Sequence, residues 1–339
     1  MSVDRVLLTG ASGFIAQHIL LQLLAAGYAV RATVRSEAKA ESVRRILRGQ
    51  GADLSRLEFA PLDLLADDGW DAAMAGCRFV LHTASPFPSA LPRDRYALVP
   101  PARDGTLRVV DAAIRAGAER LVLTSSVAAI YYGHPNQAGR AFTEADFTNI
   151  ESPATSAYSL SKTLAEQAAW ARVAGSSLEL AVINPSVVLG PLLGLEVTTS
   201  TSLVRLMLRG RLPIVPNVSL GLVDVRDVAA AHLLAMTVPE AAGRRFIVSA
   251  GSRSLREVGK VLAEVFPSYG WKLPRATLPD SFVRAAALLS PQAAQIVPEL
   301  GAPKVLVAAA AERLLGLSMR SPEEAIRATG ESLLAHRLA

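Results

Sequence analysis

The chain has 339 residues, of which 51% are hydrophobic and 5% aromatic, and its formal net charge at pH 7 is +5. This composition excludes a disordered chain, and the length predicts either a large single domain or a domain with a second lobe. The 35 basic residues are dispersed among 30 acidic ones without basic blocks or interleaved aromatics, which argues against a nucleic-acid-binding protein.

The single cysteine, Cys77, excludes an internal disulfide and is typical of a reducing compartment. The five histidines have no metal-ligand spacing, so we expect no metal site and a structural role for His82 and His232. The chain starts without a signal-peptide pattern, and Glu312 and Arg313 interrupt the apolar stretch 305–317, which favours a packed helix over a membrane span. We therefore expect a cytoplasmic protein without membrane association, either a monomer or a homodimer.

The first predicted strand, residues 3–9, leads into a turn and then into an apolar helix that ends near residue 27. The turn has the spacing Gly10-x-x-Gly13-x-x-Ala16, in which Ala16 is small enough for helix and strand to approach closely. Backbone N–H groups and the helix dipole at such a turn can bind a pyrophosphate. This position in the chain predicts a dinucleotide-binding site.

The second predicted strand, residues 29–34, ends in Arg35, and Lys39 follows four residues later. A chain that prefers NAD has an acidic residue here for the ribose 2′-OH. Two cations suit a 2′-phosphate instead, so the pattern predicts NADP. The alternative is two surface charges, which is less favoured because a cation near a helix N-terminus is mildly unfavourable.

Strands and helices alternate from residue 3 to 185. This alternation predicts an α/β fold with a doubly wound parallel sheet, in which ligands bind at the carboxyl ends of the strands. The further elements that we expect in this part are strands at 57–61, 78–85, 120–126 and 178–183, a helix at 93–117 that Pro100 and Pro101 bend or interrupt, and a loop at 131–153.

The pattern is less regular beyond residue 186. We expect a helix at 203–209, and we expect residues 223–228 and 245–249 to return to the sheet. The last part of the chain predicts a small, mostly helical lobe, with a helix that starts at 321–324. The predicted domains are a dinucleotide-binding domain (1–185 plus 222–250) and a substrate-binding lobe (186–221 plus 251–339).

Tyr158 and Lys162 lie four residues apart in a helical stretch, which places them on one face, one turn apart. The ammonium group is expected to lower the Tyr pKa toward working pH, so that the phenol can exchange a proton with a carbonyl or an alcohol. This short pattern often occurs by chance. It gains weight here because the Arg-rich chain has few lysines, at positions 39, 162, 260, 272 and 304.

Several stretches together resemble the extended short-chain dehydrogenase/reductases, especially the group of dihydroflavonol reductases, cinnamoyl-CoA reductases and yeast-type methylglyoxal/aldehyde reductases. The set is specific, although its individual motifs are not, and it covers nearly the whole chain. The matching stretches are 9–15, 31–35, 82–86, 124–126, 158–170, 184–191, 223–232 and 321–334.

The resemblance implies roles for individual residues. Ser126, with Ser125 as a lesser candidate, would polarise the substrate carbonyl. Tyr158 would protonate the developing alkoxide, and Lys162 would bind the nicotinamide ribose and lower the Tyr pKa. The implied cofactor contacts are Gly10, Gly13, Phe14 and Ile15 for the pyrophosphate, Arg35 and Lys39 for the 2′-phosphate, Asp63 and Leu64 for the adenine, Thr83, Ala84 and Ser85 for the ribose, and Pro185 for the nicotinamide.

Departures from the family pattern indicate the kind of substrate. In the plant flavonoid reductases an Asn follows the catalytic Ser by four residues and contacts substrate hydroxyls, whereas this chain has Ile130. Ile130, together with Ser85, Phe87, Tyr131 and Val188, predicts a pocket for an apolar or aryl aldehyde or ketone. The Asn-Trp-Tyr-Cys-Tyr stretch of the cinnamoyl-CoA enzymes is absent, which disfavours a CoA thioester.

We therefore predict an NADPH-dependent carbonyl reductase that acts on a small molecule. One alternative is a hydroxysteroid dehydrogenase or a nucleotide-sugar epimerase on the same scaffold. Arg205, Arg209 and Arg211 could bind a sugar-nucleotide diphosphate, whereas Arg35 argues against this alternative. Another is a non-catalytic NADP(H)-binding sensor, which the intact set of catalytic residues disfavours.

Overall fold

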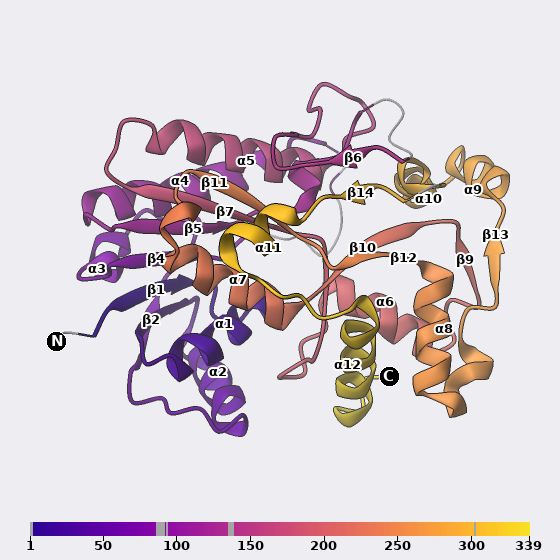
Figure 1. The fold of residues 1–339 in the computed structure, drawn as a ribbon, viewed down its shortest axis with the longest axis horizontal. Helices are drawn as coiled ribbons and strands as arrows, with labels where there is room; N and C mark the ends of the chain where they lie inside the picture. Colours follow the sequence, from indigo (N-terminus) through magenta and orange to yellow (C-terminus); the bar gives the residue numbers. More distant parts are fainter. Residues whose placement is uncertain (1–2, 86–91, 93, 135–138, 302) are drawn as a thin grey trace.

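A seven-stranded sheet forms the centre of the larger part of the molecule in the computed structural model (Figure 1). The structure describes residues 3–85, 92, 94–134, 139–301 and 303–339. The strand order is β11-β7-β5-β4-β1-β2-β3 and all neighbours are parallel, which confirms the predicted doubly wound sheet. The strands are β1 (Arg5–Thr9), β2 (Ala29–Val34), β3 (Leu57–Pro61), β4 (Phe79–His82), β5 (Arg120–Thr124), β7 (Glu179–Pro185) and β11 (Arg244–Val248).

Helices cover both faces of this sheet. Because successive strand residues point to opposite faces, Val6 and Leu8 pack into one core and Leu7 packs into the other. The strands are therefore nearly continuous runs of buried residues. The helices of the first face are α1 (Phe14–Ala25), α2 (Glu37–Gly49), α7 (Val225–Thr237) and α11 (Ala309–Leu315), and those of the second are α3 (Trp70–Met74), α4 (Val99–Arg115) and α5 (Ala157–Val173).

A smaller lobe adjoins the carboxyl ends of the strands (Figure 1). Its core packs three helices, α6 (Thr199–Leu208), α8 (Leu255–Val265) and α12 (Pro322–Ala335), against a three-stranded sheet. Ser321 caps α12 by accepting a hydrogen bond from the Glu324 N–H, as its sequence predicts. The other elements of this part are β8 (Val187–Leu189), β9 (Ile214–Pro216), β10 (Ser219–Asp224), β12 (Gly251–Ser254), β13 (Ala276–Leu278), α9 (Asp280–Ala287) and α10 (Pro291–Ile296).

Three predictions about individual elements are wrong, the third of which concerns the stretch 305–317. Pro100 and Pro101 do not bend a helix that begins at residue 93, because α4 begins at Val99 and the prolines lie in its first turn, where their missing N–H groups cost nothing. Residues 223–228 do not join the large sheet, because β10 pairs with β8 and β12 and α7 begins at Val225.

The stretch 305–317 is also different from the expected single helix. Its first residues form β14 (Val305–Leu306), which pairs with β6 (Ala141–Phe142) in the region expected to be a loop. Its last residues form α11, which packs in the same core as α1 and α7 rather than in the core of the smaller lobe. In the described part of the chain no helix is long and apolar enough to span a bilayer.

Candidate active site

A cavity of about 270 Å³ lies where the strands of the large sheet end. Residues from both parts of the molecule line it, because β7 continues into β8 of the smaller lobe and α6 begins nearby. Its lining residues are Gly13, Phe14, Ile15, Ala16, Thr83, Ser85, Thr124, Ser125, Ser126, Tyr158, Lys162, Pro185, Ser186, Val188, Thr198 and Ser200.

The glycine turn after β1 is tight and leads directly into the N-terminus of α1. Gly10 has a positive φ of 73°, and a Cβ there would lie 2.9 Å from the Ala84 Cα, so only glycine fits. Gly13 is the N-cap of α1 and supplies no side-chain acceptor to the first turn, which leaves those N–H groups for a ligand. Phe14 and Ile15 border the cavity beside this turn.

Hydrogen bonds hold the ends of β1 and β4 together beside the turn. Thr83 Oγ1 donates to the Thr9 carbonyl oxygen at 2.6 Å, and the Ala84 N–H donates to Thr9 Oγ1 at 3.1 Å. His82 Nδ1 lies 2.7 Å from the same hydroxyl, and burial lowers the pKa of His82 to about 3. His82 is therefore a neutral structural residue, as expected. Thr83 and Ser85 line the cavity, whereas His82 does not.

Arg35 and Lys39 lie just after β2, at the start of α2. Arg35 is exposed, and the Lys39 ammonium forms an ion pair with Glu196 from the segment between β8 and α6. Asp63 and Leu64 follow β3, at the far edge of the sheet. The Asp63 carboxylate accepts a hydrogen bond from the Leu65 N–H.

Leu64 packs against Gly105 of α4, where a Cβ would lie 2.7 Å from the Leu64 Cγ. The predicted cofactor residues thus lie near the carboxyl ends of the strands, spread from β3 to β7 across the sheet. Six of these residues do not line the cavity itself: Gly10, Arg35, Lys39, Asp63, Leu64 and Ala84.

Ser126, Tyr158 and Lys162 come together at the cavity. Ser156 is the N-cap of α5 and accepts a hydrogen bond from the Ser159 N–H, so Tyr158 lies in the first turn and Lys162 one turn later. Tyr158 forms a hydrogen bond with Ser126, and the Lys162 Nζ lies 6.0 Å from the centroid of the Tyr158 ring.

The predicted lowering of the Tyr158 pKa is not what the structure gives. Burial raises the pKa of Tyr158, and the hydrogen bond with Ser126 only opposes this rise. Burial also lowers the pKa of Lys162 to about 8, although the negative charge of Glu166 acts in the other direction. Desolvation disfavours the charged form of both groups, and it is the largest influence on each pKa.

The structure distinguishes the two neighbouring serines. Ser125 Oγ donates a hydrogen bond of 2.6 Å to the buried Glu166 carboxylate, whereas the Ser126 side chain accepts one from the Ala128 N–H at 3.1 Å and faces Tyr158. Ser126 is therefore the serine that is available to a carbonyl oxygen.

The predicted substrate residues lie in different surroundings. Ser85 and Val188 line the cavity, together with Pro185. Ile130 is fully buried in a core cluster with Val127, Phe142, Ile247 and Ala308, so its side chain can affect a substrate only indirectly.

Tyr131 packs against that cluster and donates a hydrogen bond of 3.0 Å to the Tyr132 hydroxyl. Phe87 lies outside the described residues.

Several residues of the site were not predicted from the sequence. Glu166 lies four residues after Lys162, and this spacing was the only available signal for it. Ser186, Thr198 and Ser200 reach the cavity from the segment that joins the two parts of the molecule, where no local pattern marks them.

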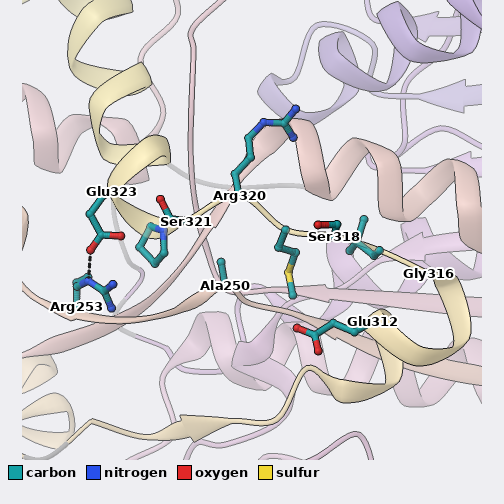
Figure 2. A pocket seen from close by; sticks show the side chains of 11 residues that line it. Ala250, Arg253, Glu312, Gly316, Ser318, Arg320, Ser321 and Glu323 are labelled. Carbon is teal, nitrogen blue, oxygen red and sulfur yellow. Dashed lines mark hydrogen bonds and ion pairs between the residues drawn. The ribbon is translucent and has the colours of Figure 1, made fainter.

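A second, open depression of about 640 Å³ lies between α11 and α12 (Figure 2). Arg253 pairs with Glu323 at 2.5 Å across one side of it, and Arg320 pairs with the buried Asp227. It shares no residue with the cavity at Tyr158, and these charges are already paired, so the structure gives no reason to place the reaction there. Among the described residues no cluster of His, Cys, Asp and Glu is suited to a metal ion.

Comparison with known proteins agrees with this arrangement. The model of the NAD dependent epimerase/dehydratase family matches residues 6–251. The cinnamoyl-CoA reductase CAD2 of Medicago truncatula is 38% identical over 78% of this chain and 81% of its own length. The tetraketide alpha-pyrone reductase 2 of Arabidopsis thaliana is 35% identical over 79% of this chain and 84% of its own length.

The chain belongs to this family, the extended short-chain dehydrogenase/reductases. It is accordingly an oxidoreductase. Among solved structures, yeast methylglyoxal/isovaleraldehyde reductase Gre2 in complex with NADPH superposes with a TM-score of 0.81 and 29% sequence identity. The superposition covers 99% of this chain and 100% of the Gre2 chain. UDP-glucose 4-epimerase of Thermotoga maritima, 20% identical with a TM-score of 0.73, shares the fold of this short-chain reductase.

Proposed function

We propose that the protein is an NADPH-dependent carbonyl reductase that reduces an apolar or aryl aldehyde or ketone to the alcohol. The observation that carries this proposal is the hydrogen-bonded pair of Ser126 and Tyr158, with Lys162 one turn further, in the same cavity as the glycine turn. Relatives in the family are reductases by name, of cinnamoyl-CoA and of methylglyoxal or isovaleraldehyde.

The chain's own residues suit a dinucleotide with a 2′-phosphate. The N-terminus of α1 at Gly10 and Gly13 would receive the pyrophosphate, with Phe14 and Ile15 beside it. Arg35 and Lys39 would bind the 2′-phosphate. Lys39 would leave its ion pair with Glu196 to do so. The remaining contacts would be Asp63 and Leu64 with the adenine, Thr83, Ala84 and Ser85 with the ribose, and Pro185 with the nicotinamide.

The bound cofactor supplies the hydride, and three side chains do the rest. Ser126 donates a hydrogen bond to the carbonyl oxygen, where negative charge develops in the transition state. Tyr158 gives its proton to that oxygen, and its raised pKa keeps it protonated at neutral pH, as a proton donor must be. The Lys162 ammonium, beside the Tyr158 ring, stabilises the phenolate that remains.

The two parts of the molecule would divide these tasks. The predicted dinucleotide-binding domain (1–185 plus 222–250) would hold the cofactor, and the predicted lobe (186–221 plus 251–339) would lie over the reacting end. Two elements cross these bounds, because α11 packs with the first domain and β10 pairs within the lobe. Apolar side chains in the cavity, Phe14, Ile15 and Val188, suit a substrate without many hydroxyl groups.

The test follows NADPH absorbance with a panel of aryl aldehydes, α-keto esters, diketones, a steroid ketone and a dihydroflavonol. We expect oxidation of NADPH with an apolar or aryl carbonyl. Tyr158→Phe should lower kcat/KM by ~10²–10⁴-fold and leave the Kd for NADPH nearly unchanged. Tyr28→Phe, a hydroxyl removed before β2 at the opposite end of the sheet, is the matched control and should keep full activity.

Unchanged turnover in Tyr158→Phe would contradict the mechanism. Tight NADPH binding without oxidation across the whole panel would instead favour an epimerase or a cofactor-binding sensor.

A further inference from the structure

Glu166 is a fully buried carboxylate on the same helix as the catalytic pair. It lies one turn after Lys162 and two turns after Tyr158 on α5, and its side chain has no exposed surface. A buried carboxylate is costly unless it is paired and hydrogen-bonded, so its partners indicate why it is there.

One carboxylate oxygen joins the helix to the ends of two strands. Glu166 Oε2 accepts hydrogen bonds from Ser125 Oγ at 2.6 Å and from Asn184 Nδ2 at 3.0 Å. The same Asn184 nitrogen lies 3.2 Å from the backbone carbonyl oxygen of Ser126. The segment just after β5, which carries Ser125 and Ser126, and the end of β7 are thus tied to α5 through a single side chain.

The other carboxylate oxygen joins the helix to β11. Glu166 Oε1 accepts a hydrogen bond of 2.5 Å from Arg245 Nε. The Arg245 guanidinium lies 3.8 Å from the centroid of the Phe147 ring and donates to the carbonyl oxygens of Glu144 and Asp146. Arg245 is itself 92% buried, since its relative exposure is 8%.

We propose that Glu166 is a positioning residue for carbonyl reduction, which holds Ser126 and the Tyr158–Lys162 face of α5 in fixed relation through Ser125, Asn184 and Arg245. This inference rests on the proposed function. Ser126 is fixed on both sides, because the hydroxyl of its neighbour Ser125 donates to Glu166 and its own carbonyl oxygen accepts from Asn184, which Glu166 also binds.

The same contacts give Glu166 an electrostatic effect on Lys162. Lys162 and Glu166 border one small cavity of about 10 Å³. The titratable groups around Lys162 are Tyr158 and Glu166 on its own helix and His82 on β4, with Arg245 of β11 behind Glu166. Since the carboxylate opposes the lowering of the Lys162 pKa by burial, removal of its charge should lower that pKa further.

The test compares wild type with Glu166→Gln. In the variant we expect kcat to fall at least ~10-fold, because Ser126 and Tyr158 lose their fixed alignment, while the Kd for NADPH stays within about twofold. We also expect the Lys162 pKa to fall. The chain has only five lysines, so ¹³C NMR of protein labelled at the lysine ε-carbon can follow Lys162 directly, and Lys162→Met assigns its signal.

Glu179→Gln is the matched control. Glu179 pairs with the buried Arg120 at 2.6 Å and joins the same two strands, β5 and β7, at their other ends. The Glu179→Gln variant should lower the free energy of unfolding without any change in the Lys162 pKa or in kcat. Should Glu166→Gln fail to fold, the double variant Glu166→Gln/Arg245→Gln, which removes both buried charges, is measured in its place.

Equal kcat in wild type and the Glu166 variant, or an unchanged Lys162 pKa, would overturn the inference. The NMR titration needs no turnover, so it remains decisive if the wild-type protein reduces no carbonyl, a result that would refute the proposed function alone.

Discussion

Tyr158 and Lys162 show how burial changes an acid–base pair. Each group loses hydration of its charged form, so the pKa of Tyr158 rises while that of Lys162 falls to about 8. At neutral pH the phenol therefore keeps its proton. The proposed role of Tyr158 as the proton donor in carbonyl reduction requires this protonated state, whereas alcohol oxidation would require the phenolate.

Arg35 carries the residue-scale prediction for cofactor choice. Arg35→Asp should lower the ratio of kcat/KM with NADPH to that with NADH by ~10-fold or more, because a carboxylate repels a 2′-phosphate and accepts a hydrogen bond from a 2′-OH. The measurement is steady-state kinetics with both cofactors. Arg45→Asp, an equal charge change at an exposed position of α2, should leave the ratio unchanged. An unchanged ratio in Arg35→Asp would mean that Arg35 is only a surface charge.

At the scale of elements, the turn between β1 and α1 depends on its first glycine. Gly10 combines a positive φ with a close approach to Ala84 at the end of β4. An added methyl group would strain the backbone and push these two strand ends apart, although hydrogen bonds through Thr9 hold them together.

Gly10→Ala should therefore destabilise the protein by roughly 2–4 kcal/mol and weaken NADPH binding. Gly175→Ala is the matched control, since Gly175 has a φ of 78° but no atom within 4 Å of an added Cβ. It has the backbone strain without the steric clash, so it should lose only about 1–2 kcal/mol and bind NADPH normally. Urea denaturation and fluorescence titration measure the two effects. Equal losses of stability in both variants would show that the contact with Ala84 is unimportant.

At the scale of the whole molecule, three imidazoles are buried in the neutral form. Burial lowers the pKa values of His18 and His232 to about 4 and that of His82 to about 3, from 6.5. The unfolded chain binds protons below pH 6.5, whereas the folded chain binds them only near pH 4 and below. The three neutral imidazoles therefore stabilise the folded state fully above pH 6.5, and this stabilisation is lost as the pH falls from 6.5 toward 4.

The free energy of unfolding should consequently fall between pH 7 and pH 5, by roughly 2 kcal/mol for each buried imidazole. Urea denaturation at several pH values measures this slope. His232→Gln loses the contact of 2.7 Å between His232 Nε2 and Thr124 Oγ1 and should be less stable at pH 7, but its slope should be shallower. A slope in His232→Gln equal to that of the wild type would contradict the explanation.

Local interactions account for what the sequence determined by itself. The alternation of strands and helices, the glycine turn after β1, the cap at Ser321 and the placement of Tyr158 and Lys162 on one helix face depend on residues a few positions apart, and the sequence displays that spacing directly. The fold and the meeting of the proposed catalytic residues near the strand ends followed from these patterns.

Only the tertiary structure decided features that depend on distant residues. Ser125 and Ser126 are equivalent by position, yet Glu166, 41 residues from Ser125, binds one and leaves the other for the cavity. Arg245 reaches Glu166 across 79 residues of sequence. The burial of Ile130, the pairing of β10 and the pKa values of Tyr158 and Lys162 have the same origin. Desolvation and long-range pairing are set by what surrounds a group in space, and no local pattern records this.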